Sequence, residues 1–268
     1  ICGHVVDPQP GETVLDMCAA PGGKATHLAS LMKDQGRVVC LDRGPGRARK
    51  IAQAATALGL SSVEVLPFFD ATRACDDQLT PGSDWSFPPF PPESFDRVLV
   101  DAPCSGVGQR PLFVSARRLK SVRPAALRSN EPVQRRLLTA AFQLLRPGGT
   151  LVYSTCTLRP EENEHQVEWL LRKFDGRLSL VDQQPWMLGD GLVDSSSLTG
   201  PVQKFDPSRL CALHSHDEAG GMMTCFSYAT NPAVWPSTIF SADYASNYLT
   251  PESDTIGFFI AKFLKSTE

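Results

Sequence analysis

The chain has 268 residues, of which 42% are hydrophobic, and a formal net charge of −3. This length is at the upper end of one α/β domain and allows a full buried core, so we expect a single domain over residues 1–268. The negative charge excludes a global electrostatic attraction to nucleic acid. No run of 18 or more apolar residues is present, so no membrane association is expected. The eight cysteines lack C-x-x-C spacing, which predicts neither a metal site nor a disulfide framework and favours a reducing, cytoplasmic setting.

Short β-branched runs alternate with amphipathic stretches from Thr13 onward. This alternation predicts an α/β fold with a mostly parallel sheet of seven strands and helices on both faces. The expected strands are Thr13–Met17, Arg37–Asp42, Val63–Pro67, Arg97–Asp101, Thr150–Ser154, Leu178–Val181 and Ile256–Phe263. The expected helices are Lys24–Lys33, Pro45–Leu58, Pro132–Leu145 and Pro160–Phe174.

Two segments interrupt this alternation. Asp76–Glu93 is rich in Pro, Ser and Asp and is expected to be a surface insertion. Residues 183–253 have weak periodicity, and we interpret them as a family-specific insertion without an assigned structure. The chain begins at Ile1, already close to the first strand, which suggests a fragment with an N-terminal part missing.

A loop of small residues follows the first strand and opens the first helix. Small residues let a ligand approach the backbone at a helix N-terminus, so the loop predicts a nucleoside cofactor site. The second strand ends about 20 residues later in Asp42, where α/β folds place a carboxylate on ribose hydroxyls, and Asp70 is expected to contact the adenine. The alternative is a tight turn with two solvated acids. The loop residues predicted to bind the cofactor are Cys18, Ala19, Ala20, Pro21, Gly22, Gly23 and Lys24.

Two other nucleotide motifs are excluded by the same loop. A P-loop needs a glycine where Cys18 stands, and Ser or Thr where Ala25 stands. The dinucleotide fingerprint G-x-G-x-x-G is absent, because Gly22 and Gly23 are adjacent and Ala20 occupies the first glycine position. A hydride-transfer enzyme is therefore not expected.

Two cysteines and one acid follow the fourth and fifth strands. Asp101 and Cys104 lie in D-A-P-C-S-G, and Cys156 lies in S-T-C-T. The carboxyl ends of parallel strands meet at one sheet edge, where ligands bind. A single cysteine there is more often inert packing, but two cysteines, an acid and a cofactor pocket together favour catalysis.

Methylation of a pyrimidine carbon needs such a set of residues. Carbon 5 of cytosine is too weak a nucleophile to accept a methyl group unaided, and addition of a thiolate at carbon 6 makes it reactive. Asp101 can hydrogen-bond N3 and the exocyclic amine as charge develops on the base. The second cysteine is a plausible agent for breaking the carbon–sulfur bond, but the spacing does not decide which thiol attacks.

At these residues the chain resembles the Sun/Fmu family of RNA cytosine-5 methyltransferases. The matching motifs are C-A-A-P-G-G-K at Cys18 to Lys24, D-A-P-C-S-G at Asp101 to Gly106, S-T-C-T at Ser154 to Thr157 and E-N-E at Glu162 to Glu164. The resemblance implies a Rossmann-like class I methyltransferase fold with S-adenosyl-L-methionine as cofactor. It also implies that Cys156 attacks the base and Cys104 assists release. Asp101 and Lys24 are expected to serve both catalysis and cofactor binding.

Within this family, the branch of the sixth Sun-domain member is most similar. The supporting stretches are Gly106 to Pro111, Lys204 to Ser208 and Asp254 to Phe263. Members of this branch methylate a cytosine near the 3′ end of the tRNA acceptor stem, so the resemblance implies a tRNA partner. They also carry an N-terminal PUA-type RNA-binding domain, of which we expect no counterpart within residues 1–268. We expect a monomer.

A run of basic residues follows the D-A-P-C-S-G motif. Such a run is usually a solvated surface. Its place beside the predicted site favours contacts to RNA phosphates. The run consists of Arg110, Arg117, Arg118, Lys120, Arg123 and Arg128. His214 and His216 form an H-x-H pair without a third ligand at suitable spacing, so we interpret them as loop residues. The alternative functions are rRNA cytosine-5 methylation, a catalytically idle RNA-binding or assembly module, and methylation of a small molecule or protein.

Overall fold

A computed structural model describes most of the chain. The described residues are 1–67, 69–75, 90–106, 129–157, 159–181, 188–190, 203–205 and 259–267. No helix within these ranges is long and apolar enough to cross a membrane.

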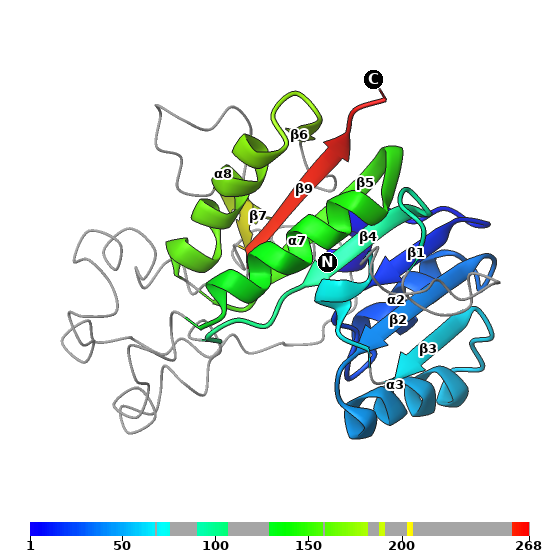
Figure 1. Cartoon of the computed structure of the whole chain (residues 1–268). Helices are drawn as coiled ribbons and strands as arrows, with labels where there is room; N and C mark the ends of the chain where they lie inside the picture. The colour runs from blue at the N-terminus through cyan, green and yellow to red at the C-terminus, as the bar shows by residue number, and fades with distance from the viewer. Residues whose placement is uncertain are drawn as a thin grey trace, which may run out of the picture.

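A single twisted sheet forms the centre of the molecule (Figure 1). Its strand order is β3-β2-β1-β4-β5-β9-β8-β7, and β6 pairs with the free part of β9. The five strands from β3 to β5 in this order pair in parallel, whereas β9 is antiparallel to its neighbours. The strands are β1 Thr13–Asp16, β2 Arg37–Asp42, β3 Val63–Pro67, β4 Phe95–Asp101, β5 Leu145–Thr155, β6 Leu178–Leu180, β7 Leu188–Asp190, β8 Gln203–Phe205 and β9 Phe259–Lys265.

Helices cover both faces of the sheet. One face packs against α1 (Cys2–Val6), α2 (Gly23–Leu31) and α3 (Pro45–Ala57), and the other packs against α7 (Glu131–Leu144) and α8 (Glu164–Lys173). Side chains of a strand alternate between the two faces of the sheet, so a strand can contribute to the hydrophobic cluster on each face. In β1, for example, Val14 belongs to the cluster with α2, and Leu15 belongs to the cluster with α7.

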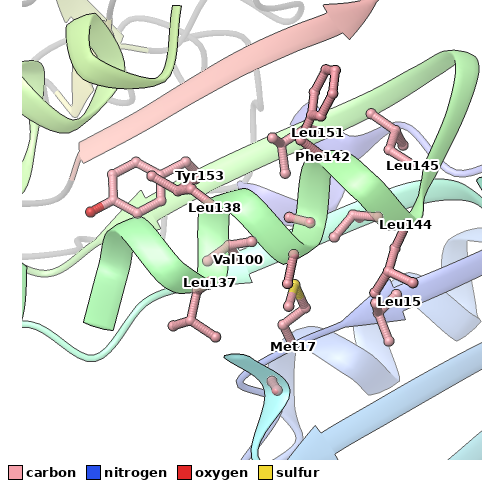
Figure 2. Close-up of a cluster of buried hydrophobic side chains, with 14 of the residues drawn as sticks. Leu15, Met17, Val100, Leu137, Leu138, Phe142, Leu144, Leu145, Leu151 and Tyr153 are labelled. Atoms are coloured by element: carbon pink, nitrogen blue, oxygen red, sulfur yellow. The ribbon is translucent and has the colours of Figure 1, made fainter. Parts of the chain in front are cut away.

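The larger core lies between α7 and the sheet (Figure 2). Helix α7 places Leu138 and Phe142 on the strands, where Leu151 and Tyr153 of β5 meet them. All four side chains are at most 2% exposed. Burial of each such side chain stabilises the fold by about 1.5 to 3 kcal/mol. This core fixes α7 against the carboxyl ends of β4 and β5.

The predicted α/β fold with seven strands and helices on both faces is confirmed, and the structure adds details. Two further short strands, β7 and β8, lie inside the segment 183–253 that was left without structure. Helix α1 was not predicted, because five residues are too few to show helical period.

Several predicted boundaries are wrong by one residue or more, and three of these differences have a clear structural reason. The expected helix Pro160–Phe174 is divided into a 3-10 turn, η2 (Pro160–Glu162), and α8, because Asn163 leaves the helical region with φ −117° and ψ −99°. The last strand runs to Lys265, two residues beyond its expected end, because it follows β5 and β6 to their ends. The fifth strand begins at Leu145 rather than Thr150, across a register irregularity opposite Phe95 and Arg97.

Candidate functional site

A cavity of about 690 Å³ opens at the carboxyl ends of β1, β2, β4 and β5. This is the edge at which open parallel sheets bind ligands. Met17 and Leu137, which also belong to the core in Figure 2, line the cavity. Its full lining is Met17, Cys18, Ala20, Asp42, Arg43, Arg47, Phe69, Asp70, Ala71, Asp101, Ala102, Pro103, Cys104, Ser105, Gly106, Val133, Leu137 and Cys156.

The small-residue loop turns sharply from β1 into α2. Gly22 precedes α2 with φ +112°, and a Cβ atom there would lie 2.9 Å from the Cα atom of Ile51. Glycine is therefore required both for the backbone angle and for the close approach of α3. The loop places Cys18 and Ala20 on the cavity wall.

Two acids from the ends of β2 and β3 also line the cavity. Asp42 ends β2, and its Oδ1 accepts the Gly44 N–H at 2.9 Å while its Oδ2 pairs with Arg47 Nη2 at 3.1 Å. Asp70 follows β3 and caps the turn η1 (Ala71–Arg73) by accepting the Thr72 N–H at 3.1 Å. Both carboxylates are thereby oriented at the cavity wall, as the sequence predicted.

Asp101 is held on two sides at the end of β4. Lys24 Nζ lies 2.7 Å from its Oδ2, and the Ser154 hydroxyl donates to its Oδ1 at 2.7 Å. Burial disfavours the charged form of Lys24, but the neighbouring Asp101 carboxylate outweighs this effect and leaves the pKa of Lys24 raised. Lys24 therefore stays charged, and the contacts from Lys24 and Ser154 fix the orientation of the Asp101 carboxylate.

The two predicted cysteines meet beside this carboxylate. Cys104 Sγ and Cys156 Sγ lie 3.3 Å apart, on loops that follow β4 and β5. The hydrogen bond with Cys156, together with burial, raises the pKa of Cys104 far above that of a free thiol. The protonated form of the Cys104 thiol is therefore favoured.

Behind the thiols lies a buried polar network that the sequence analysis did not predict. The Glu162 carboxylate accepts the Ser105 N–H at 3.0 Å and the Asn130 side-chain amide at 3.1 Å. Gln134 from α7 donates to the Pro103 carbonyl at 3.0 Å and reaches the same carboxylate at 3.4 Å. The only signal for this network in the sequence is the E-N-E motif.

Asp16, at the end of β1, is a fully buried acid beneath the site. Its Oδ1 accepts the Cys18 N–H at 3.2 Å, and its Oδ2 has no hydrogen-bond partner among the described residues. Burial and the nearby Asp101 charge raise its pKa to about 7. Asp16 was not predicted as a site residue.

The predicted site residues are brought together at one edge, though not all reach the cavity. Seven line it directly: Cys18, Ala20, Asp42, Asp70, Asp101, Cys104 and Cys156. Lys24 acts through Asp101, whereas Ala19, Pro21, Gly22 and Gly23 shape the turn. The basic run 110–128 and the pair His214 and His216 lie outside the described residues. Among the described residues, no cluster could hold a metal ion.

Comparison with known proteins gives consistent matches. The chain is 45% identical over 269 residues to the mouse tRNA (cytosine(72)-C(5))-methyltransferase NSUN6, covering 99% of this chain and 51% of that protein. The human protein of the same name is 42% identical, with the same coverage. The chain thus spans about half the length of these curated relatives. A crystal structure of NSun6 from Pyrococcus horikoshii with SFG superposes with a TM-score of 0.66 at 27% identity, covering 100% of this chain and 51% of that one.

A family model described as 16S rRNA methyltransferase RsmB/F matches residues 3–190, which is more than half of the chain. This range includes the small-residue loop, both cysteines and the Glu162 network. The chain therefore belongs to the RsmB/F methyltransferase family.

Proposed function

We propose that the protein uses S-adenosyl-L-methionine to methylate carbon 5 of a cytosine in tRNA. The observation that carries this proposal is the pair of thiols 3.3 Å apart beside an oriented carboxylate on one cavity wall. Methylation of a small molecule or a protein gives no role to two such thiols. The relatives named tRNA (cytosine(72)-C(5))-methyltransferase support the same reaction.

The cavity suits the proposed cofactor. Its volume of about 690 Å³ lies within the range of about 300 to 1,000 Å³ typical of small-molecule sites. Asp42 and Asp70 offer acceptors for ribose hydroxyls and an adenine amine, and Phe69 offers an apolar ring face. The related archaeal structure was solved with SFG, an analogue of S-adenosylmethionine. When bound, the cofactor supplies an electrophilic methyl group.

The remaining steps are assigned to residues of the chain. Cys156, after losing its proton to solvent, adds to carbon 6 of the cytosine and makes carbon 5 nucleophilic. Asp101, held by Lys24 and Ser154, stabilises the base through N3 and the exocyclic amine. After methyl transfer, the carbon 5 proton passes to water, its electron pair restores the ring double bond, and the Cys156 sulfur departs as a thiolate. Cys104 is placed to act at this release step.

We further propose that the target lies near the 3′ end of the acceptor stem, as in the tRNA branch of the family. Methylation of rRNA is the second candidate, because the family model describes a 16S rRNA methyltransferase. The free thiols at Cys104 and Cys156 fit the reducing cytoplasm.

The test is methyl transfer from radiolabelled S-adenosylmethionine by the full-length protein. Unmodified tRNA transcripts should accept label at one cytosine, located by bisulfite sequencing, and 16S rRNA transcripts should not. Label on rRNA alone would replace tRNA as the substrate. Absence of label on both would leave the idle RNA-binding module as the better reading.

A further inference from the structure

Glu162 is a completely buried carboxylate outside the cavity. Its exposure is 0%, it lies in η2, and it is absent from the cavity lining. A buried charge is costly unless hydrogen bonds and an opposite charge compensate it. Four donor groups converge on this carboxylate from Ser105, Asn130 and Gln134, and Arg159 Nη1 lies 3.9 Å from Oε2. These hydrogen bonds and the nearby Arg159 compensate the burial of the Glu162 carboxylate. Two of the four donor groups belong to Ser105, in the loop that follows β4.

That loop carries Cys104. The Ser105 N–H lies 3.0 and 3.3 Å from the two Glu162 oxygens, and the Ser105 hydroxyl donates to Oε2. The same hydroxyl lies 2.8 Å from the Thr157 hydroxyl, beside Cys156. Gln134 fixes the Pro103 carbonyl on the other side of Cys104. Hydrogen bonds to a charged acceptor are the stronger kind, so Glu162 is the main anchor of this loop.

The next residue, Asn163, anchors the other cysteine. Asn163 Oδ1 accepts the Thr155 hydroxyl at 2.6 Å, and its Nδ2 donates to the Thr157 carbonyl at 3.0 Å. These contacts bracket Cys156. The Tyr153 hydroxyl donates to the Glu162 carbonyl at 2.6 Å, which ties the Glu162–Asn163 pair to β5.

We propose that Glu162 and Asn163 are positioning residues that set the relative placement of the two thiols. Glu162 holds Cys104 for the release step, and Asn163 holds Cys156 for attack. This inference rests on the proposed function and deepens it, because it assigns one positioning residue to the attack step and another to the release step. Neither residue lines the cavity.

Substitutions of Glu162 and of Asn163 should impair different steps of the reaction. In Glu162→Gln, one acceptor oxygen is replaced by an NH2 group that can only donate, so the four donor groups share a single neutral oxygen and part of the Ser105 contact is lost. Cys104 should then shift while Cys156 still attacks. Release should slow by about 10-fold to 100-fold, the effect of losing one or two hydrogen bonds to a charged group. One methyl per enzyme should transfer rapidly, followed by a stalled protein–RNA adduct. Asn163→Ala should instead slow attack and leave no adduct.

Glu161→Gln is the matched control for Glu162→Gln. Glu161 is in the same turn, also pairs with Arg159 (3.3 Å), and is half-exposed, and its carboxylate makes no hydrogen bond to the Cys104 loop among the described residues. Its variant should turn over like the wild type. Pre-steady-state transfer to a tRNA transcript and denaturing gels measure both phases. An equal loss in both Glu variants, or a loss in Glu162→Gln without adduct, would overturn the proposal.

Ser105→Ala addresses the case in which Glu162→Gln fails to fold. It removes the hydroxyl contacts to Glu162 and Thr157 but keeps the buried carboxylate and the backbone donor. Circular dichroism and thermal unfolding establish the folded fraction of each variant. Ser105→Ala should show the same stalled adduct with a smaller delay, and normal release in a folded Ser105→Ala protein would count against the proposal.

Cross-linking separates this proposal from the proposed function. Without RNA, diamide takes two electrons and two protons from the Cys104 and Cys156 thiols and joins them as a disulfide. Mass spectrometry of the linked peptides gives the rate. Glu162→Gln should cross-link about 10-fold more slowly than Glu161→Gln, even if the wild type transfers no methyl group to any RNA. Equal rates would overturn the positioning role, whatever the enzymatic activity.

Discussion

Cys104 and Cys156 lie in different sequence motifs, but their sulfur atoms lie 3.3 Å apart. The sequence leaves their roles open, and the family resemblance assigns attack to Cys156. The structure adds that the hydrogen bond to Cys156 and burial raise the pKa of Cys104. A Cys104 thiol that keeps its proton fits the release role that the family resemblance gives it.

Replacement of each thiol tests this division. Cys156→Ala should abolish methylation, because no sulfur can reach carbon 6 of the base. Cys104→Ala should still attack and then hold the RNA covalently, which appears as a slow band on a denaturing gel. Free turnover of Cys104→Ala without such a band would contradict the assignment.

Asp16 makes stability depend on pH. Its folded-state pKa is raised from 3.8 to about 7, so the folded protein binds a proton more tightly than the unfolded chain does. The resulting stabilisation is present at low pH and is lost as pH rises from about 4 to about 7. Asp16→Asn should remove this loss and raise the free energy of unfolding at pH 8 by about 2 to 4 kcal/mol, measured by urea unfolding.

Asp34 provides a control of opposite sign for that measurement. Hydrogen bonds from Ser62 and Ser61 lower its pKa, so its contribution is present at neutral pH and is lost on acidification. Asp34→Asn should therefore lower stability at pH 8. Equal responses of the two variants would show that the burial of Asp16 does not govern the pH dependence.

At the scale of elements, the turn from β1 into α2 determines how closely α2 and α3 pack. Gly22→Ala should destabilise the protein by about 2 kcal/mol, because φ +112° is strained for alanine and its Cβ meets the Ile51 backbone. The neighbouring Gly23→Ala places its Cβ in open space at the start of α2 and should change stability by less than about 0.5 kcal/mol. Chemical unfolding of both variants without ligand measures the difference. Equal destabilisation would mean that the close contact with α3 is not responsible.

At the scale of the whole molecule, the charge is −3, so RNA binding needs a local basic surface. The run that includes Arg117 and Arg118 is the candidate in the sequence. Arg117→Ala with Arg118→Ala should weaken tRNA binding and reduce the slope of log affinity against log salt by about 1 to 2. Filter binding at several salt concentrations measures this slope. Unchanged affinity and slope would remove the run from the RNA interface.

The sequence by itself determined the sheet and the edge at which the candidate site residues meet. Strand period and turn residues are local signals, and parallel strands bring their carboxyl ends to one edge. Asp42, Asp70, Asp101 and both cysteines could therefore be predicted without coordinates. The roles of the two thiols needed the family resemblance as well.

Only the tertiary structure decided how the thiols are supported. Glu162 lies in a charged stretch of sequence that suggests a solvated surface, yet its carboxylate is buried against the Cys104 loop. Asn163 interrupts the expected helix, and its side chain contacts Thr155 and Thr157 on either side of Cys156. The pKa of Asp16 is raised by burial and by the charge of Asp101 on another strand. These effects depend on contacts between residues distant in the chain, which neither periodicity nor motif spacing records.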